Sequence, residues 1–256
     1  MKTAIRLTFF LALVVFHEMQ AQELTPVGSD RPAETDAVLT LPKGYWQVES
    51  GIAYTKFKST DNNISIFSIP AFLIKYGVSN AIELRVSYNS IFNKFKNSTE
   101  EGSFRQNIFA VSGKVNIVHE NGLVPEITLI LNWNYADIIS EGSKISSESE
   151  NEPGLRVVFS NALADNISLV YSVGHIYDFS FTIVPALVIS PKSDLFLEYY
   201  TIFNFGNING FYSDGINFGY DYLINNNFKI DVMLGAWLDT NNFNGYITTG
   251  IAWRFK

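Results

Sequence analysis

Hydrophobic and polar positions alternate through residues 244–256, the C-terminal stretch of the chain. Successive side chains of an extended strand point to opposite faces, so this pattern predicts one oily face and one mixed face. The oily face carries Ile247, Thr249, Ile251, Trp253 and Phe255, and the other carries Tyr246, Thr248, Gly250, Ala252 and Arg254. Such a strand fits the closing strand of a membrane β-barrel, which pairs with the first strand and leaves no free edge. The alternative is an edge strand of a secreted β-sandwich.

From Gly44 onward, turn signals divide the chain into segments of about 10 to 15 residues, the length of membrane-crossing strands. The expected strands cover residues 44–58, 64–77, 81–93, 106–118, 123–137, 153–161, 166–177, 181–190, 195–205, 211–224, 228–239 and 244–256. An even number of strands lets an antiparallel barrel close with both chain ends on one side. The sequence therefore predicts an all-β fold, a transmembrane up-and-down antiparallel β-barrel of about 12 strands.

Charged residues follow the same alternation and gather on one face of the expected strands. Leu84 and Val86, for example, alternate with Glu83 and Arg85. A basic side chain that faces lipid at mid-bilayer costs roughly 2 to 4 kcal/mol, so the charged face is expected to line the lumen. The candidate lumen-lining residues are Glu49, Glu83, Arg85, Lys114, Glu126, Arg156, Glu198, Asp231 and Arg254. They either select solutes or form an ion-pair network that fills and stiffens the barrel.

Connection lengths distinguish the two ends of the expected barrel. Connections after even-numbered strands are short, whereas two of the others, residues 94–105 and 138–152, are long, polar and rich in Ser and Glu. Short periplasmic turns with longer outer loops are typical of outer-membrane barrels. Pro70, Pro125 and Pro185 fall inside expected strands, and because proline cannot donate to the ladder we expect local bulges there.

Aromatic residues favour the same fold. The chain has 13 Tyr and 21 Phe against 3 Met, a composition that favours strands over helices. Trp46, Tyr76 and Trp237 lie near expected strand ends, as an interfacial girdle requires. The aromatic C-terminal strand also looks like a barrel-assembly signal, although Phe255 is followed by Lys256. Outer-membrane lipid and the barrel-assembly machinery are therefore the expected macromolecular partners.

Residues 1–21 have the features of a secretory signal peptide. Lys2 and Arg6 are followed by a short, largely apolar run at 7–16, and the small residue Ala21 precedes the expected cleavage site. The chain contains no Cys, so no disulfide framework can form. Its net charge of -7 gives no electrostatic footprint for nucleic acid. We expect a bacterial outer-membrane location after export and cleavage of the signal peptide.

Residues 22–43 form the expected irregular N-terminal segment, because Pro26, Pro32 and Pro42 break any helix or strand. The segment and the strand after it contain Asp30-Arg31-Pro32, Glu34-Thr35-Asp36, Pro42-Lys43-Gly44, Glu49 and Gly51. With these residues the chain resembles the MetA-pathway phenol-degradation family of outer-membrane proteins, which are often labelled transporters. The resemblance implies a channel-like outer-membrane barrel. It does not imply that phenol is the substrate.

Residues suited to covalent chemistry are scarce. Beyond the signal peptide, His119 and His175 are the only histidines, and no zinc, serine-hydrolase or phosphate-loop motif occurs. His175 is expected near the outer end, so a barrel enzyme that uses it as a base on lipid is a rival interpretation. The carboxylates of residues 137–152 could bind calcium, but their spacing matches no template and a solvated acidic loop is preferred. We expect no catalytic residue, cofactor or metal.

The expected number of strands bears on what the interior holds. Barrels of about eight strands are filled by side chains, whereas those of about sixteen or more hold aqueous channels. A barrel of intermediate size predicts a narrow pore or cavity, which residues 22–43 occlude as a plug. We expect passive passage of small solutes, hydrophobic or aromatic ones included, through a transporter-like barrel formed by residues 44–256. A structural barrel with a filled lumen is the third interpretation.

Overall fold

The computed structural model describes residues 25–58, 62–97, 101–141, 147–176, 179–204, 211–238 and 244–256. The expected signal peptide, residues 1–21, lies outside these ranges. Within them, no helix is long and apolar enough to cross a membrane.

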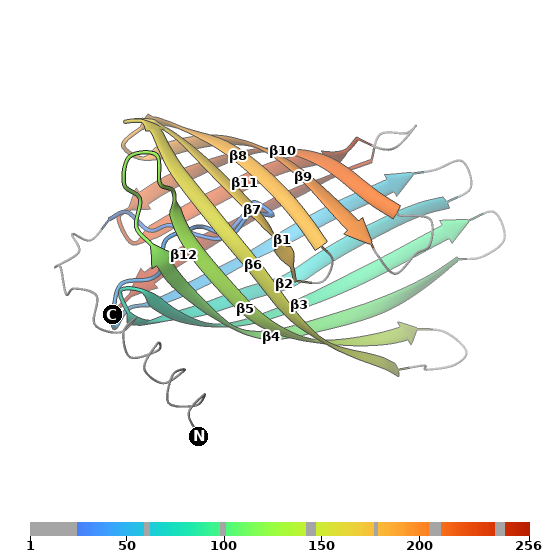
Figure 1. Ribbon diagram of the computed structural model, residues 1–256. Coiled ribbons are helices and arrows are strands. Elements are labelled where there is room, and N and C mark those ends of the chain that lie inside the picture. Colours follow the sequence, from blue (N-terminus) through green and yellow to red (C-terminus); the bar gives the residue numbers. More distant parts are fainter. Residues whose placement is uncertain are drawn as a thin grey trace, which may run out of the picture.

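Twelve antiparallel strands form one closed barrel, in which sequence neighbours pair and β1 also pairs with β12 (Figure 1). The strands are β1 (Trp46–Lys58), β2 (Asn62–Ser79), β3 (Ile82–Asn97), β4 (Glu101–Val118), β5 (Glu126–Glu141), β6 (Ser147–Ala164), β7 (Ile167–His175), β8 (Phe179–Ser190), β9 (Ser193–Asn204), β10 (Phe211–Asn225), β11 (Phe228–Trp237) and β12 (Gly245–Phe255). This strand number and topology confirm the predicted fold class.

β12 closes the barrel against β1. Their register runs from Trp46 opposite Phe255 to Lys56 opposite Gly245. Trp253 of β12 is 51% exposed on the outside, whereas its neighbour Ala252 is fully buried. The predicted alternation in the C-terminal stretch is therefore confirmed, with the oily face outward.

The other strands have the same two faces. Leu84 and Leu131 are 54% and 55% exposed on the outside, while Glu83 and Ile130 are each 1% exposed on the inside. Every strand carries at least one large exposed hydrophobic residue. The outer surface is therefore an apolar band of the kind that faces lipid in outer-membrane barrels, and the inside is rich in polar side chains.

Aromatic rings gather at both ends of the wall. At the end where the C-terminus lies, Trp46 packs on Tyr76 with ring centroids 4.6 Å apart. At the opposite end, Phe57 packs on Trp237 at 4.4 Å. Trp46 and Tyr76 point outward, as the predicted interfacial girdle requires, whereas Phe57 and Trp237 lie on the inward face of their strands.

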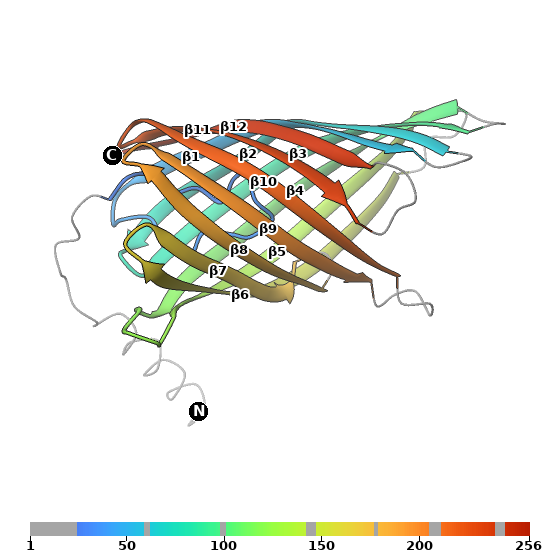
Figure 2. The same cartoon turned by 90° about the horizontal axis from the view of Figure 1, so that it is seen from above.

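One end of the barrel carries the C-terminus and the short turns at residues 80–81, 165–166, 191–192 and 226–227. We call it the turn end, and the opposite end the loop end. In Figure 2 the tips of β2, β3 and β4 project beyond β8 to β11 at the loop end. The barrel wall is therefore taller on one side than on the other.

The predicted long loops at the loop end are wrong in extent. Residues 94–97 and 101–105 belong to β3 and β4, and residues 138–141 and 147–152 belong to β5 and β6. These segments are largely polar and do not continue the oily outward face: Lys94 and Lys96 stand on it in β3, and Ile138 and Ile139 fall on opposite faces of β5. Pairing with a neighbouring strand extends the ladder there without any lipid-facing pattern.

The three prolines differ in their effects. At Pro70 the register between β2 and β3 shifts, so the predicted bulge is confirmed. Pro125 precedes β5, so the predicted strand start at residue 123 is wrong. At Pro185 the pairing of β8 with β9 skips Val184 and Pro185 and then resumes in the same register. No bulge forms there, because the proline removes a ladder bond without adding a residue.

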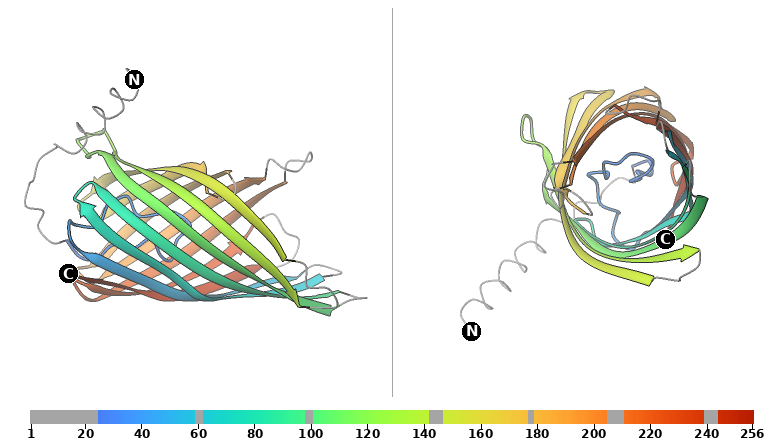
Figure 3. Two further views of the ribbon diagram at one scale, coloured as in Figure 1. Left: turned by 90° about the horizontal axis from the view of Figure 1, so that it is seen from below. Right: turned by 90° about the vertical axis from the view of Figure 1, so that its right-hand side faces the viewer.

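Residues 25–45 contain no helix or strand. The right-hand view of Figure 3, which looks along the barrel axis, shows this segment in blue inside the ring of strands. We call it the inner segment. It carries the Asp30-Arg31-Pro32 motif and the described part of the predicted irregular segment.

Candidate functional site

The inner segment is fastened at both of its ends to the turn end of the barrel. The N–H of Val27 donates to the carbonyl of Asn226 at 2.9 Å, and Nη2 of Arg254 donates to the carbonyl of Thr25 at 2.8 Å. At the other end of the segment, the N–H of Gly44 donates to a carbonyl of β2 at 2.7 Å. The residues between these points therefore form a loop that reaches into the lumen.

Asp30 lies within a cluster of basic side chains from β2, β3 and β4. Its carboxylate pairs with Lys75 and Arg85 and lies 3.5 Å from Nζ of Lys114. Glu49 of β1 accepts the N–H of Asp30 at 3.1 Å. Burial alone would raise the pKa of Asp30, but the positive charges of Arg85, Lys114 and Lys75 hold it well below its usual range. Asp30 is therefore ionised and joins the inner segment to three strands.

Asp36 bridges two arginines of the barrel wall. Its Oδ1 lies 3.1 Å from both Nη1 and Nη2 of Arg85, and its Oδ2 lies 2.9 Å from Nη1 of Arg156. Arg156 also donates to the carbonyl of Glu34 at 2.9 Å and to Oγ of Ser180 at 3.2 Å. Burial opposes the charge on Asp36, but the neighbouring guanidinium groups lower its pKa overall.

Glu198 of β9 holds the backbone of the inner segment at its tip. Its carboxylate accepts the N–H groups of Glu34 and Thr35, each at 2.9 Å, and the hydroxyl of Thr35 at 2.7 Å. Asn217 of β10 donates to it at 2.7 Å. A fully buried carboxylate needs such partners, and four of them satisfy it. Glu198 thereby fixes the position of the tip.

Arg31 points toward the wall formed by β11, β12 and β1. Its Nη2 donates to Oγ1 of Thr248 at 2.7 Å and lies 3.6 Å from Oδ1 of Asp231. A Cβ atom at Gly51 would lie 2.2 Å from the guanidinium carbon of Arg31, and one at Gly250 would lie 2.4 Å from its Nε. Both glycines therefore leave the space that the guanidinium occupies.

Two further candidate residues have different surroundings. Glu83 accepts the N–H of Leu41 at 2.8 Å. Glu126 is the first residue of β5, where it accepts a hydrogen bond from the side-chain amide of Asn116, accepts the N–H of Glu120 at 2.6 Å and lies 3.1 Å from Nδ1 of His119. Within the described ranges, every candidate lumen-lining residue except Glu126 has a contact with the inner segment.

Lys75 is a residue of this site that the sequence analysis missed. It is 3% exposed and pairs with both Asp30 and Glu49. Its position between Ile74 and Tyr76 in an expected strand already places it on the inward face. The same alternation that identified Arg85 could therefore have identified Lys75.

His175 lies on the outward side of β7, the face opposite to that of the buried Ser172. Its Nε2 is 3.3 Å from Oε1 of Glu152, and its side chain is 45% exposed. The rest of the predicted acidic loop belongs largely to β5 and β6, and the side chains of Glu141, Glu148 and Glu150 lie outside the described part of the chain. Among the side chains that are described, no group of three or more His, Cys, Asp or Glu could hold a metal ion.

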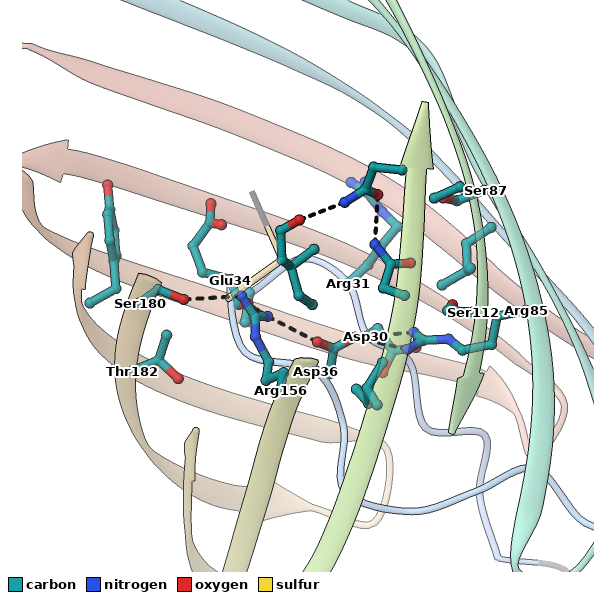
Figure 4. A pocket seen from close by; sticks show the side chains of 18 of the residues that line it. Asp30, Arg31, Glu34, Asp36, Arg85, Ser87, Ser112, Arg156, Ser180 and Thr182 are labelled. Atoms are coloured by element: carbon teal, nitrogen blue, oxygen red, sulfur yellow. Dashed lines mark hydrogen bonds and ion pairs between the residues drawn. The ribbon is translucent and has the colours of Figure 1, made fainter. Parts of the chain in front are cut away.

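A cavity of about 370 Å³ lies between the tip of the inner segment and the barrel wall (Figure 4). Asp30, Arg31, Glu34 and Asp36 border it on the inner-segment side. On the wall side it is bordered by Arg85, Arg156 and the hydroxyl groups of Ser87, Ser112, Ser180 and Thr182.

Comparisons with known proteins show which solved structures share this fold. No family model matches the chain, and no curated protein sequence matches it. An outer membrane channel from Pseudomonas putida F1 is similar in structure, with a TM-score of 0.60 and 10% sequence identity over 88% of this chain and 100% of that chain. The fold is that of an outer-membrane β-barrel.

Other solved β-barrel structures are also similar, at the same sequence identity and with lower TM-scores. The transport unit of the autotransporter AIDA-I from Escherichia coli has a TM-score of 0.52 and 10% identity, covering 83% of this chain and 90% of its own. The KdgM porin in complex with disordered oligogalacturonate has a TM-score of 0.52 and 10% identity, covering 82% of this chain and 99% of its own. Likeness at this identity shows the fold alone, so the use of this barrel must be argued from its interior.

Proposed function

We propose that this protein is a channel of the bacterial outer membrane through which small solutes pass, with the inner segment as a plug in its lumen. The observation that carries the proposal is the cavity of about 370 Å³ beside a tip that polar contacts hold. A barrel of about twelve strands has more internal space than its own side chains fill. Here that space is shared between the inner segment and the cavity.

The contacts of the tip support a plug that can shift. Ion pairs and hydrogen bonds connect it to Arg85, Arg156 and Glu198. Water can replace such contacts at a small net cost, because exchanging partners leaves few groups unpaired. Apolar packing is limited to small clusters such as Val38 with Ile130 and Val158. The tip can therefore move while the two ends of the segment stay fastened at the turn end.

The location and partners belong to the same proposal. The chain is exported, its signal peptide is removed after Ala21, and the barrel-assembly machinery inserts it with the turn end in the periplasm. Outer-membrane lipid surrounds the apolar band. The candidate lumen-lining residues border the solute path, and no covalent chemistry or cofactor takes part. The fold likeness to an outer membrane channel and the resemblance of Asp30-Arg31-Pro32 to the MetA-pathway family support this interpretation, which includes hydrophobic and aromatic solutes.

A structural barrel with a permanently filled lumen is the second candidate function. The ion-pair network of Asp30 and Asp36 with the wall favours it, since such a network also stiffens a barrel. The two functions differ in whether solutes cross.

The experiment is solute flux into proteoliposomes. The chain from residue 22 is refolded, its folding is checked by heat-modifiable migration on a gel, and liposome swelling is followed in an isosmotic small sugar. A channel gives swelling above protein-free liposomes, and a variant with a loosened plug, Asp36→Asn, gives faster swelling. Folded barrels that give no swelling in either form would establish the filled-lumen alternative.

A further inference from the structure

The tip of the inner segment presents a carboxylate to two guanidinium groups at once. One oxygen of Asp36 contacts Arg85 at 3.1 Å, and the other contacts Arg156 at 2.9 Å. Charge-assisted hydrogen bonds from arginine are the strong and geometrically selective means by which proteins bind carboxylates. Two wall arginines therefore form a carboxylate site, and the chain's own Asp36 occupies it.

Both arginines border the cavity, as Figure 4 shows for Arg156 between Asp36 and Ser180. The volume of about 370 Å³ lies within the range of small-molecule sites. The hydroxyl groups of Ser87 and Ser112 face the same space. The apolar part of its lining includes Leu73, Ala110, Ile130 and Ile202. The cavity can therefore receive a molecule with one anionic end and an apolar body.

The two arginines differ in what remains when Asp36 leaves. Arg85 keeps its pair with Asp30, and its Nε lies 3.4 Å from Glu83. For Arg156, Asp36 is the one carboxylate within 4.0 Å among the described residues, and its buried Nε has no hydrogen-bond partner there. An incoming carboxylate therefore gains most at Arg156, and it does not need to disturb the cluster around Asp30.

We propose that Arg85 and Arg156 form a binding site for small monocarboxylates with an apolar body, and that Asp36 occupies this site while the plug is seated. An arriving carboxylate replaces the Asp36 carboxylate and leaves the charge balance at the two arginines unchanged. The displaced Asp36 moves into the water of the cavity and frees the tip from β6. This names a substrate class for the channel proposed above and rests on that proposal for the passage step; binding itself does not require passage.

The test is equilibrium binding by titration calorimetry with the refolded full chain from residue 22 in detergent. Benzoate is the probe, and benzamide, which has the same shape and no charge, is the ligand control. We expect benzoate to bind and benzamide not to bind. Asp36→Asn keeps the side-chain shape and removes the competing charge, so it should tighten benzoate binding about tenfold or more. Arg156→Gln should abolish benzoate binding.

Arg105→Gln is the matched control variant. Arg105 stacks over the ring of Phe92 at 4.3 Å and does not border the cavity, so the same substitution there should leave benzoate binding unchanged. Equal binding of benzamide, unchanged affinity in Asp36→Asn, or retained binding in a folded Arg156→Gln barrel would each overturn the site. Benzoate binding without solute flux would contradict the proposed channel function and support the binding site. Solute flux without benzoate binding would contradict the binding site and support the channel function.

Discussion

Oδ2 of Asp36 lies 2.9 Å from Nη1 of Arg156, and this contact joins the inner segment to β6 inside the lumen. Arg31, five residues earlier in the chain, contacts Thr248 on β12. One short stretch thus bridges walls that lie far apart in the barrel order. In the channel proposed above, the seating of this stretch decides whether the lumen is blocked, and weakening its contacts one at a time tests that role.

Glu198→Ala should release the tip of the inner segment. It leaves the N–H groups of Glu34 and Thr35 without an acceptor, and for the buried N–H of Thr35 this costs about 1 to 3 kcal/mol. The chain has no Cys, so a single Ala33→Cys substitution at the cavity edge reports exposure through maleimide labelling. We expect labelling of Cys introduced there to become about tenfold faster or more when Glu198 is also replaced.

Glu101→Ala is the control for that measurement. Glu101 pairs with Lys96 on the surface, where both side chains are largely exposed, so its loss should leave labelling unchanged. Equal labelling rates for the Glu198→Ala and Glu101→Ala barrels would show that Glu198 does not hold the tip.

Gly51→Ala should displace Arg31 without breaking the wall. The three atoms nearest the added Cβ all belong to the flexible guanidinium of Arg31, so the arginine moves and loses Thr248 and Asp231. We expect faster swelling of proteoliposomes and an unchanged heat-modifiable gel shift. Gly113→Ala makes the same change in open space and should leave the rate unchanged. If proteoliposomes with the Gly51→Ala barrel swell at the same rate as those with the Gly113→Ala barrel, Arg31 does not help to hold the inner segment in place.

Much of the barrel follows from the sequence, since lipid outside and charge inside impose a strict two-residue period. Leu84, Glu83 and Ile130 each take the side that this period gives them. The pattern of an oily outer face fails at residues 94–97, where Lys94 and Lys96 take the outward positions, and at residues 138–141, where each face carries one isoleucine. The two-residue period also gives no information about which side chains contact each other across the lumen. That Asp30 meets Lys75, Arg85 and Lys114 depends on how the inner segment folds back among three strands, which no local pattern records.

Glu126 shows a second thing that the strand pattern does not predict, which is the height of a residue along the barrel axis. Its place on an inward face predicts a lumenal position, yet its described partners are Asn116 of β4 and His119 and Glu120 of the connection after β4. A strand pattern fixes the face of a residue but not its height in the barrel relative to the inner segment. Residues near the turn end can therefore share the charged face without bordering the cavity.

Raising the pH should loosen the plug. Burial within the barrel and the charges of Glu198 and Asp36 raise the pKa of Glu34 to about 7 from an ordinary value of 4.5, while Arg156 opposes the shift. Because the folded state holds this proton more tightly than the unfolded chain, its stability falls as pH rises from 4.5 to about 7. Glu34 borders the open cavity, so water screens part of the effect and only its direction is predicted.

Proteoliposome swelling at pH 5.5 and pH 8 measures this loosening. Swelling should be faster at pH 8, and Glu34→Gln should remove the difference. Asp30 and Asp36 have lowered pKa values and stay ionised throughout that range, so they contribute no change. A pH difference that persists in Glu34→Gln would assign it to another group.

His175→Ala separates the channel from an enzyme that acts on lipid. His175 lies on the outward face and pairs with Glu152 in an exposed position, where such a pair contributes about 0 to 1 kcal/mol. Swelling should therefore be unchanged in the variant. Release of fatty acid from outer-membrane lipid by the wild-type barrel, lost in His175→Ala, would instead support catalysis.

The most direct measurement is single-channel conductance of the refolded chain in a planar bilayer, compared with Asp36→Asn. We expect small or infrequent current steps for the wild-type barrel and larger or more frequent steps once Asp36 no longer holds the tip to Arg85 and Arg156. Silence from both barrels, each folded by its gel shift, would contradict a channel closed by the inner segment.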